Sequence, residues 1–344
     1  MEHGCYTALV TPFTPEGDLD PDGLAQLIDF QIKNGITGIL ATGTTGESPT
    51  FKWKEHDYVV SLAAKQTKGK CKCIAGTGSN NTQEALDGTG HALDEGVDAV
   101  LAVDPYYNGP SSLEIRREYY EVLAKEYPNL PIIPYIIPGR TGAQMLPQDL
   151  AILADNFKNI FAVKEATGNL DNMKLTRKLC GPDFNILSGD DALVYQIMTD
   201  PGIKAVGSFS VMANIAPGFM TRMVTLINDG KIDQALDIQK ALSPLLDLVV
   251  VTTQENTPYG SVACRARNPL PLKTMMQILG MPAGPGRRPL GRMTRKGFDV
   301  VLGVMKQVQA NTPEVFLPVA DFFGVDIDKR LDEAGKNTNL WYDY

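Results

Sequence analysis

Eight short apolar segments, separated by helical patterns, constrain the fold of this chain more than any other feature. They are predicted as strands at residues 6–10, 38–41, 73–76, 99–103, 132–136, 160–164, 185–188 and 204–207. None alternates strictly between apolar and polar residues, which is typical of parallel strands buried on both faces. A strand and a helix recur roughly every 25–30 residues, which suits βα units.

Helix signals fall between the apolar segments. Asp20 followed by Pro21 is typical of a helix start, and Gly35 of a helix end. Further helices are predicted near residues 54–67, 82–95, 113–126, 147–155, 169–179, 191–199 and 216–228. Eight such units predict an α/β fold, the (β/α)8 TIM barrel, which typically needs about 250 residues. The alternative, a doubly wound sheet, would place a glycine-rich fingerprint after its first strand, where this chain has TPFTPEGDLD.

The last third of the chain has a different pattern. Helices are predicted at 232–251, 272–279 and 292–309, with a loop-rich stretch at 252–267 that looks inserted and a tail beyond about residue 310. We expect residues 1–228 to form the barrel. Residues 229–344 are expected to form a C-terminal helical region and tail packed on it.

Composition excludes several function classes. The net charge of -8 argues against nucleic acid or an anionic membrane as the main partner. No apolar run is long enough for a transmembrane helix, and the start of the chain does not resemble a signal peptide. The five scattered cysteines predict reduced thiols and a cytoplasmic location, or an organelle matrix if a transit peptide has been removed. The three distant histidines argue against a histidine metal site.

The segment FAVKEATGN, residues 161–169, ends an apolar strand with a lysine. Lysine is among the side chains least often buried without a partner. In a (β/α)8 barrel the carboxyl ends of the strands face the active site, which would place Lys164 there. Burial lowers the pKa of an amine, and a neutral amine can attack a ketone to form a Schiff base. The alternative is that Lys164 only pairs with Glu165 or another carboxylate.

GTTGES, residues 43–48, follows the second strand. Glycines let a backbone approach a ligand closely, and exposed N–H groups can hold a carboxylate. Thr44 and Thr45 add two hydroxyl groups. No lysine follows the second glycine, so the segment is not a phosphate-binding P-loop. On its own it is a weak signal, because many such turns only connect elements.

Tyrosines and an arginine follow the fourth and fifth strands. Tyr135 could shuttle protons beside an iminium, and Arg140 could bind a carboxylate bidentately. The alternatives are aromatic packing for Tyr106, Tyr107 and Tyr135, and a surface ion pair for Arg140. Together the strand ends would supply a nucleophile, a phenol relay, a carboxylate clamp and an anion-binding backbone on one face of the barrel.

The order of these motifs resembles the dihydrodipicolinate synthase and N-acetylneuraminate lyase family of pyruvate-dependent class I aldolases. The matching pieces are GTTGES (43–48), GTGSNNTQEA (76–85), PYYN (105–108), Y-x-x-P-x-R-T-G (135–142), KEATGN (164–169) and SGDDA (188–192). They span most of residues 4–228. GTTGES, KEATGN and Arg140 are most similar to the synthase branch, which uses an arginine there for the carboxylate of aspartate semialdehyde.

The resemblance implies four catalytic residues. Lys164 would form a Schiff base with pyruvate, whose methyl group then loses a proton to give an enamine. Tyr135, Thr44 and Tyr107 would form the proton relay. In that family the residue matching Tyr107 reaches into a neighbouring subunit, which implies a homo-oligomer, either a dimer or a tetramer. The resemblance implies no metal, and no cofactor besides the covalent adduct.

Substrate contacts are also implied by the resemblance. Thr45 would help to hold the pyruvate carboxylate, and Arg140 the carboxylate of the aldehyde. Phe209 would lie near the substrate, and Gly189 would shape the opening of the barrel together with the two aspartates that follow it. Two positions depart from the family pattern: Ile136, where asparagine is usual, and Asp104, where a smaller or hydroxylic residue is common.

A second site follows from the resemblance, because some synthases of the family are inhibited by L-lysine bound at a subunit interface. The corresponding residues are Ser48, Trp53, His56, Asn80, Glu84 and Tyr106. Glu84 could pair with an ammonium group, and Trp53 could cover the aliphatic stem of lysine. The alternative is that these polar residues only cap helices and complete an interface.

Three functions remain open from the sequence. The resemblance favours condensation of pyruvate with L-aspartate-4-semialdehyde to 4-hydroxy-tetrahydrodipicolinate, an allosterically controlled lyase reaction of lysine and diaminopimelate biosynthesis. The second is a sister aldolase that cleaves N-acetylneuraminate or a 2-keto-3-deoxy sugar acid, and Arg140 argues against it. The third is a barrel that binds lysine or pyruvate without turnover.

Overall fold

The computed structural model describes residues 1–343, and eight parallel strands close into a barrel in sequence order. The strands are β1 (Gly4–Ala8), β2 (Gly38–Ala41), β3 (Lys72–Gly76), β4 (Ala99–Val103), β5 (Ile132–Ile136), β6 (Ala162–Glu165), β7 (Asn185–Ser188) and β8 (Gly207–Ser210). β1 pairs with both β2 and β8, which closes the ring. The predicted TIM barrel is confirmed.

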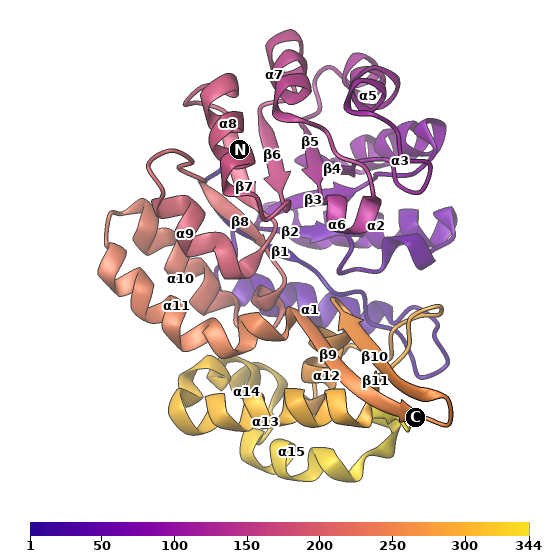
Figure 1. The fold of residues 1–344 in the computed structure, drawn as a ribbon, viewed down its shortest axis with the longest axis vertical. Coiled ribbons are helices and arrows are strands. Elements are labelled where there is room, and N and C mark those ends of the chain that lie inside the picture. Colours follow the sequence, from indigo (N-terminus) through magenta and orange to yellow (C-terminus); the bar gives the residue numbers. More distant parts are fainter. Residues whose placement is uncertain (344) are drawn as a thin grey trace.

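Helices surround the barrel (Figure 1). They are α1 (Pro21–Lys33), α2 (Trp53–Thr67), α3 (Thr82–Asp94), α4 (Ser112–Glu114), α5 (Glu121–Glu126), α6 (Pro138–Thr141), α7 (Pro147–Asn156), α8 (Leu170–Cys180), α9 (Val194–Thr199) and α10 (Pro217–Asn228). The predicted start of α1 is confirmed, because the Asp20 side chain accepts a hydrogen bond from the N–H of Gly23. Between α4 and α5 a π-helical segment runs over Ile115–Tyr120.

Alternate residues of each strand belong to two different layers. Tyr135 and Ala162 lie in the barrel interior, together with Leu187 and Phe209. Ile136 and Val163, their neighbours in sequence, belong to the larger core between the barrel and the helices. Because side chains alternate along a strand, this fixes which residues can reach the interior. Ile136 therefore lies in the outer layer, so its departure from the family pattern does not alter the barrel interior.

Four strands begin or end differently from the prediction. β3 begins one residue early, at Lys72. β1 and β6 are displaced by one or two residues, and β8 begins at Gly207, although the sequence predicts residues 204–207. Lys204 has φ of 51°, in the left-handed region, and belongs to the turn before the strand. A Cβ on Gly207 would lie 1.9 Å from the carbonyl oxygen of Gly4, so only glycine allows the close approach that starts β8.

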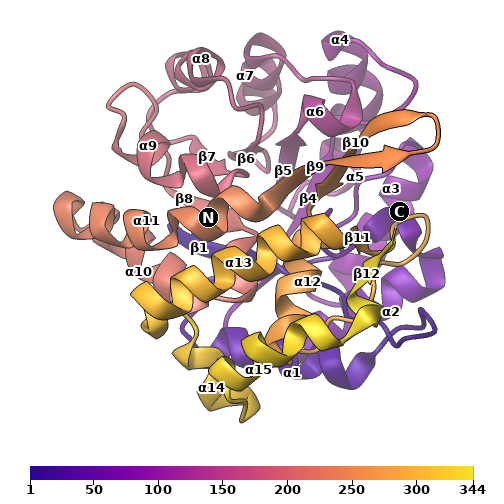
Figure 2. The ribbon, with the colours of Figure 1, turned by 60° about the horizontal axis from the view of Figure 1, so that its bottom comes forward.

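The C-terminal region folds over the side of the barrel at which the strands end (Figure 2). It contains α11 (Ile232–Leu246), β9 (Val250–Thr257), β10 (Gly260–Arg267), α12 (Leu270–Leu279), β11 (Met293–Thr294), α13 (Arg295–Asn311), α14 (Leu317–Phe323), α15 (Ile327–Glu333) and β12 (Trp341–Tyr342). The helix expected at 232–251 ends at Leu246, and the expected loop at 252–267 belongs to an antiparallel hairpin of β9 and β10. β-branched residues in VVVTT favour the strand there.

Two further observations concern the described residues. None of their helices has both the length and the apolar character that a membrane span requires. All five cysteines are free thiols, as the sequence predicts.

Candidate active site

Lys164 lies near the carboxyl end of β6, inside the barrel. The register of β5 and β6 pairs Tyr135 directly with Lys164. The Lys164 Nζ lies 4.1 Å from the centroid of the Tyr135 ring and 5.3 Å from that of Phe209 on β8. The predicted amine and phenol therefore meet at the open end of the barrel, which we call the mouth.

The surroundings of Lys164 favour the neutral amine. Its side chain is 3% exposed, and burial, reinforced by the charge of Arg140, lowers its pKa to about 7. The nearby carboxylate of Asp191 opposes this shift. The pairing with Glu165 that the sequence left open is not found in residues 1–343. Instead, the Glu165 carboxylate accepts a hydrogen bond from the N–H of Thr167 at 2.7 Å.

Tyr135 and Thr44 complete the polar surroundings of the amine. Burial raises the pKa of Tyr135, while the charge of Arg140 and a hydrogen bond with the Thr44 side chain oppose the rise. Gly189 allows the lysine to extend past it, because a Cβ there would lie 3.2 Å from Lys164 Cε and 2.8 Å from the Cβ of Ala166. Four residues that the sequence assigns separately, Lys164, Tyr135, Thr44 and Gly189, therefore belong to one site.

Thr45 and Arg140 are joined by a residue that sequence reasoning missed. The Thr45 hydroxyl accepts a hydrogen bond from Asn268 Nδ2 at 3.0 Å. Arg140 Nη2 donates to the backbone oxygen of Asn268 at 2.7 Å. Asn268 follows the hairpin, 128 residues after Arg140 in sequence. No motif places it here, because the fold alone brings the C-terminal region over the mouth.

Two buried aspartates support the strand ends. Asp191 Oδ2 accepts hydrogen bonds from the N–H groups of Val211 at 2.8 Å and Met212 at 2.7 Å, and burial raises its pKa to about 6. In the sequence, the SGDDA motif indicates that Asp191 lies at the opening of the barrel. Asp104 is fully buried and accepts hydrogen bonds from the Tyr120 hydroxyl and the Met145 N–H. Its carboxylate therefore supports β4 from outside the barrel.

Tyr107 lies apart from the site of its own chain. Its side chain is 89% exposed. Its backbone φ of 72° lies in the left-handed region, which residues other than glycine seldom adopt. Tyr106, by contrast, is half-buried and lines a cavity. The structure does not bring Tyr107 to Tyr135 or Thr44 within one chain.

That cavity has a volume of about 380 Å³ and extends from the mouth to α2 and α3. At one end it is lined by Thr44 and Tyr135. The rest of its wall includes five of the six residues predicted to bind lysine, Ser48, Trp53, His56, Glu84 and Tyr106. Asn80, the sixth, lines a neighbouring hollow, and its backbone N–H is paired with the Tyr106 hydroxyl.

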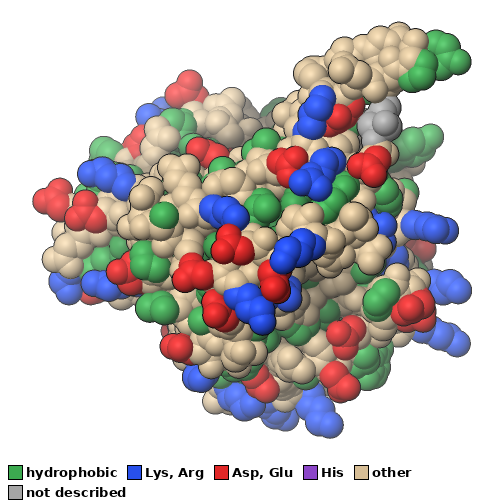
Figure 3. All heavy atoms as spheres, turned by 90° about the horizontal axis from the view of Figure 1, so that it is seen from below, with side chains coloured by type: hydrophobic (Ala, Val, Ile, Leu, Met, Phe, Trp, Pro, Cys, Tyr) green, Lys and Arg blue, Asp and Glu red, His purple; other side chains and the backbone are tan. Residues whose placement is uncertain are grey.

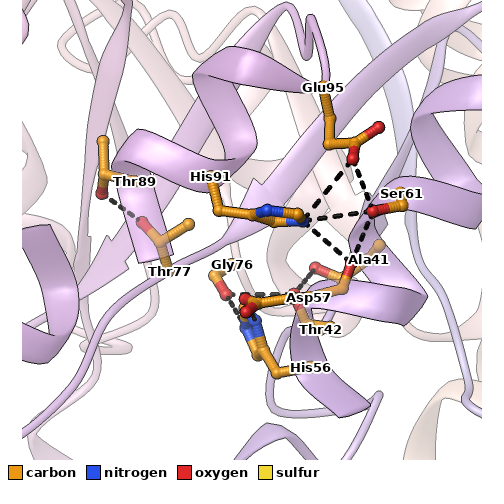
Figure 4. Close-up of polar contacts among 10 residues, drawn as sticks. All are labelled: Ala41, Thr42, His56, Asp57, Ser61, Gly76, Thr77, Thr89, His91 and Glu95. Carbon is orange, nitrogen blue, oxygen red and sulfur yellow. Dashed lines mark hydrogen bonds and ion pairs between the residues drawn. The ribbon is translucent and has the colours of Figure 1, made fainter. Parts of the chain in front are cut away.

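His56 lies in the wall of the cavity, with both ring nitrogens directed at groups of its own chain. Its Nε2 lies 2.8 Å from the backbone oxygen of Gly76, and its buried Nδ1 lies 3.6 Å from Asp57 Oδ1. Burial lowers the pKa of the ring. Figure 4 shows how the neighbouring Asp57 connects His56 with the cluster of Ser61, His91 and Glu95. His56 therefore shapes the wall of the cavity, while Glu84 supplies its carboxylate.

A second buried lysine holds the GTTGES loop rather than lining the site. Lys273 Nζ lies 2.5 Å from Glu47 Oε1 and donates to the backbone oxygen of Pro285 at 3.0 Å. Burial lowers its pKa to about 8, although the Glu47 carboxylate opposes the shift. Glu47 has φ of 61°, so this ion pair stabilises an otherwise unfavourable turn next to Thr45.

No group of three or more His, Cys, Asp or Glu side chains that could hold a metal ion is found in residues 1–343. The polar groups at the mouth are instead an amine, a phenol, hydroxyls and guanidinium groups. Such a set suits binding of a small keto acid and covalent catalysis by the amine.

Comparison with known proteins agrees with this geometry. The model of the Dihydrodipicolinate synthetase family matches residues 1–308. A 4-hydroxy-tetrahydrodipicolinate synthase of Methanococcus maripaludis (strain C6) is 41% identical over 290 residues, which cover 84% of this chain and 93% of the relative.

Two solved structures have the same fold. The 4-hydroxy-tetrahydrodipicolinate synthase of Methylacidiphilum fumariolicum SolV has a TM-score of 0.82 and 34% identity, covering 92% of this chain and 100% of that one. A synthase from Cyanidioschyzon merolae, solved with lysine bound, has a TM-score of 0.80 and 33% identity, covering 89% and 97%. The chain belongs to the dihydrodipicolinate synthetase family.

Proposed function

We propose that this chain condenses pyruvate with L-aspartate-4-semialdehyde through a Schiff base on Lys164 to give 4-hydroxy-tetrahydrodipicolinate. The observation that carries the proposal is the buried Lys164 amine, with a pKa of about 7, against the ring of Tyr135. Relatives and structural neighbours named as this synthase favour it over the sister aldolases and over a barrel without turnover.

The chemistry begins at the neutral amine. Lys164 Nζ attacks the ketone carbon of pyruvate, and the former carbonyl oxygen leaves as water, with protons moved by Tyr135 and Thr44. The resulting iminium draws electrons from the methyl group, which loses a proton to give an enamine. The enamine carbon attacks the aldehyde carbon of the acceptor. The amine of the acceptor then displaces Lys164 from the former ketone carbon, which closes the ring and frees the lysine.

The substrate roles of the remaining residues follow from their positions. Thr45 is proposed to hold the pyruvate carboxylate, Arg140 that of the aldehyde, and Phe209 to pack beside the substrate. Tyr107 is proposed to complete the relay of a second copy in a homo-oligomer. Its high exposure supports a role outside its own site.

A substrate comparison tests the proposal. Purified protein is supplied with pyruvate and aspartate semialdehyde, and in parallel with N-acetylneuraminate or a 2-keto-3-deoxy sugar acid alone. We expect product from the first pair and little or no pyruvate released from the sugar acids. Faster release of pyruvate from a sugar acid would show that the protein is a sister aldolase.

The reaction of Lys164 with pyruvate is expected to depend on pH through the amine. Below its pKa of about 7 the amine is protonated and cannot attack, so adduct formation should rise about tenfold per pH unit and level off above pH 7. Borohydride trapping after a short exposure, from about pH 5 to pH 9, measures this rate. A midpoint near the ordinary lysine value of 10.5 would contradict the proposed surroundings.

We further propose that the cavity behind the mouth binds L-lysine as an inhibitor. Glu84 offers a carboxylate for an ammonium group, and Trp53 offers an aromatic face. The lysine-bound relative supports the choice of ligand. Thr44 and Tyr135 line the same cavity, which would let a bound effector act on the proton relay.

Replacing Glu84 by glutamine is expected to weaken lysine binding by about 10- to 100-fold, since a charge-assisted hydrogen bond is lost. Isothermal titration calorimetry measures the affinity. Glu126→Gln, which removes the same charge from an exposed position, is the control and should leave the affinity unchanged. If the wild-type protein bound no lysine at millimolar concentration, the proposed lysine site would be contradicted.

A further inference from the structure

The hairpin of β9 and β10 adds groups to the mouth that the barrel itself does not supply. It lies across the strand ends in Figure 2, and in Figure 3 its far end projects from the body of the molecule. Its turn carries Tyr259, which is fully exposed. Its base, by contrast, ends at Arg267 and Asn268 beside α6. The hairpin therefore reaches the site with its base only.

Two arginines connect the base of the hairpin with α6: one donates from the hairpin to α6, and the other donates from α6 to the base of the hairpin. Arg267 donates from Nη1 and Nη2 to the backbone oxygen of Gly139, each at 3.1 Å. Arg140, the next residue, donates from Nη2 to the backbone oxygen of Asn268 at 2.7 Å. The two guanidinium groups are therefore held on neighbouring backbone segments at the same edge of the mouth.

One donor and one acceptor remain unused at this edge. Arg267 Nε is buried without a hydrogen-bond partner among the described residues. Asn268 is 6% exposed and uses Nδ2 on Thr45, while its Oδ1 is also buried and unpartnered. Leaving such buried groups unsatisfied is energetically costly. A carboxylate is the usual partner for a guanidinium N–H, and an ammonium group for an amide oxygen.

The charges at this edge also point to an anionic ligand. Burial lowers the pKa of Arg140, and the nearby charges of Arg267 and Arg265 lower it further. Within residues 1–343 the arginines that form ion pairs are Arg116, Arg287 and Arg295. Three unpaired guanidinium groups in a chain with a net charge of -8 favour a ligand carboxylate between them.

The geometry points to Arg267 as a second specificity-determining residue, which binds the carboxylate of the acceptor aldehyde together with Arg140. This inference rests on the proposed function and extends it, because it assigns the acceptor subsite partly to the hairpin. Arg267 binds the ligand through its guanidinium group, whose orientation is fixed by its hydrogen bonds to Gly139. Acceptors without a carboxylate gain nothing from it.

The test compares Arg267→Gln with wild-type enzyme in two measurements. Loss of the guanidinium is expected to raise the KM for aspartate semialdehyde by about 10- to 100-fold. The rate at which borohydride traps the pyruvate adduct on Lys164 should stay within about twofold, since pyruvate does not use this edge. Arg267→Lys, which keeps the charge but loses the planar fork, should recover part of the KM.

Arg117→Gln is the matched control, because Arg117 is exposed on the π-helical segment and carries the same charge. It should change neither quantity. Equal losses in aldehyde KM and in adduct formation would show that Arg267 only supports the structure, and an unchanged KM would show that it has no role. Either result overturns the inference alone. Wild-type enzyme that makes no product from the aldehyde would overturn the proposed function and this inference together.

Discussion

Replacing Lys164 by methionine is expected to lower kcat/KM for the condensation by at least about 10⁴-fold. The reason is that no other described amine lies inside the barrel against Tyr135. Without the amine no iminium forms, and the methyl group of pyruvate keeps its proton. A coupled assay with pyruvate and aspartate semialdehyde measures the loss. Activity within about tenfold of wild type would contradict the assigned role.

The same variant should remain folded, which separates loss of chemistry from loss of structure. In the folded chain Lys164 has a pKa of about 7, against an ordinary value of 10.5. Between these values the unfolded chain binds the proton more strongly, so this group destabilises the fold increasingly as pH falls from about 10.5 to 7, and constantly below 7. Lys164→Met should therefore melt no lower than wild type at pH 7, and its advantage should disappear toward pH 10.5.

Replacing Tyr135 by phenylalanine should lower kcat by about 10²- to 10⁴-fold, because proton transfer through the phenol is lost while the ring stays beside Lys164. The packing of the barrel should be little changed, since only one oxygen is removed. Steady-state kinetics give kcat, and thermal unfolding checks the fold.

Tyr6→Phe provides the control for Tyr135→Phe. Tyr6 also lies inside the barrel, but its hydroxyl donates to the backbone oxygen of Glu2 at the opposite end, at 2.8 Å. This variant should keep the wild-type kcat. If both phenylalanine variants lost activity alike, the loss would come from barrel packing rather than from a relay at the mouth.

The barrel could be predicted from the sequence because its signals are local. Short β-branched and apolar segments, helix caps such as Asp20 with Pro21, and regular spacing depend on residues close together in the chain. Lys164, Tyr135 and Thr44 could be predicted for the same reason, since each ends or follows a strand and the fold brings strand ends together. Asp191 could also be predicted, because it belongs to the SGDDA motif.

The rest depends on contacts between distant residues. Asn268 reaches Thr45 across 223 positions, and Arg287 donates to Glu47 across 240. No local pattern reports such partners, so the sequence predicts a loop in place of the hairpin and gives no signal for the role of Lys273. The exact start of β8 likewise depends on the contact between Gly207 and Gly4.

Two predictions that do not concern the active site stay predictions. The division of the chain at residue 228 is one, since a single hydrophobic core includes Val224 from the first part and Leu242 and Phe298 from the second. The cytoplasmic location is the other. Neither affects the chemistry proposed for the mouth.

The most direct measurement is mass spectrometry of peptides after treatment with pyruvate and borohydride. We expect one reduced pyruvyl group, located on Lys164 and absent from Lys164→Met. Lys273, also buried but paired with Glu47, serves as an internal comparison and should carry none. A pyruvyl group on Lys273 or on another lysine, or no adduct on wild-type protein, would contradict covalent catalysis by Lys164.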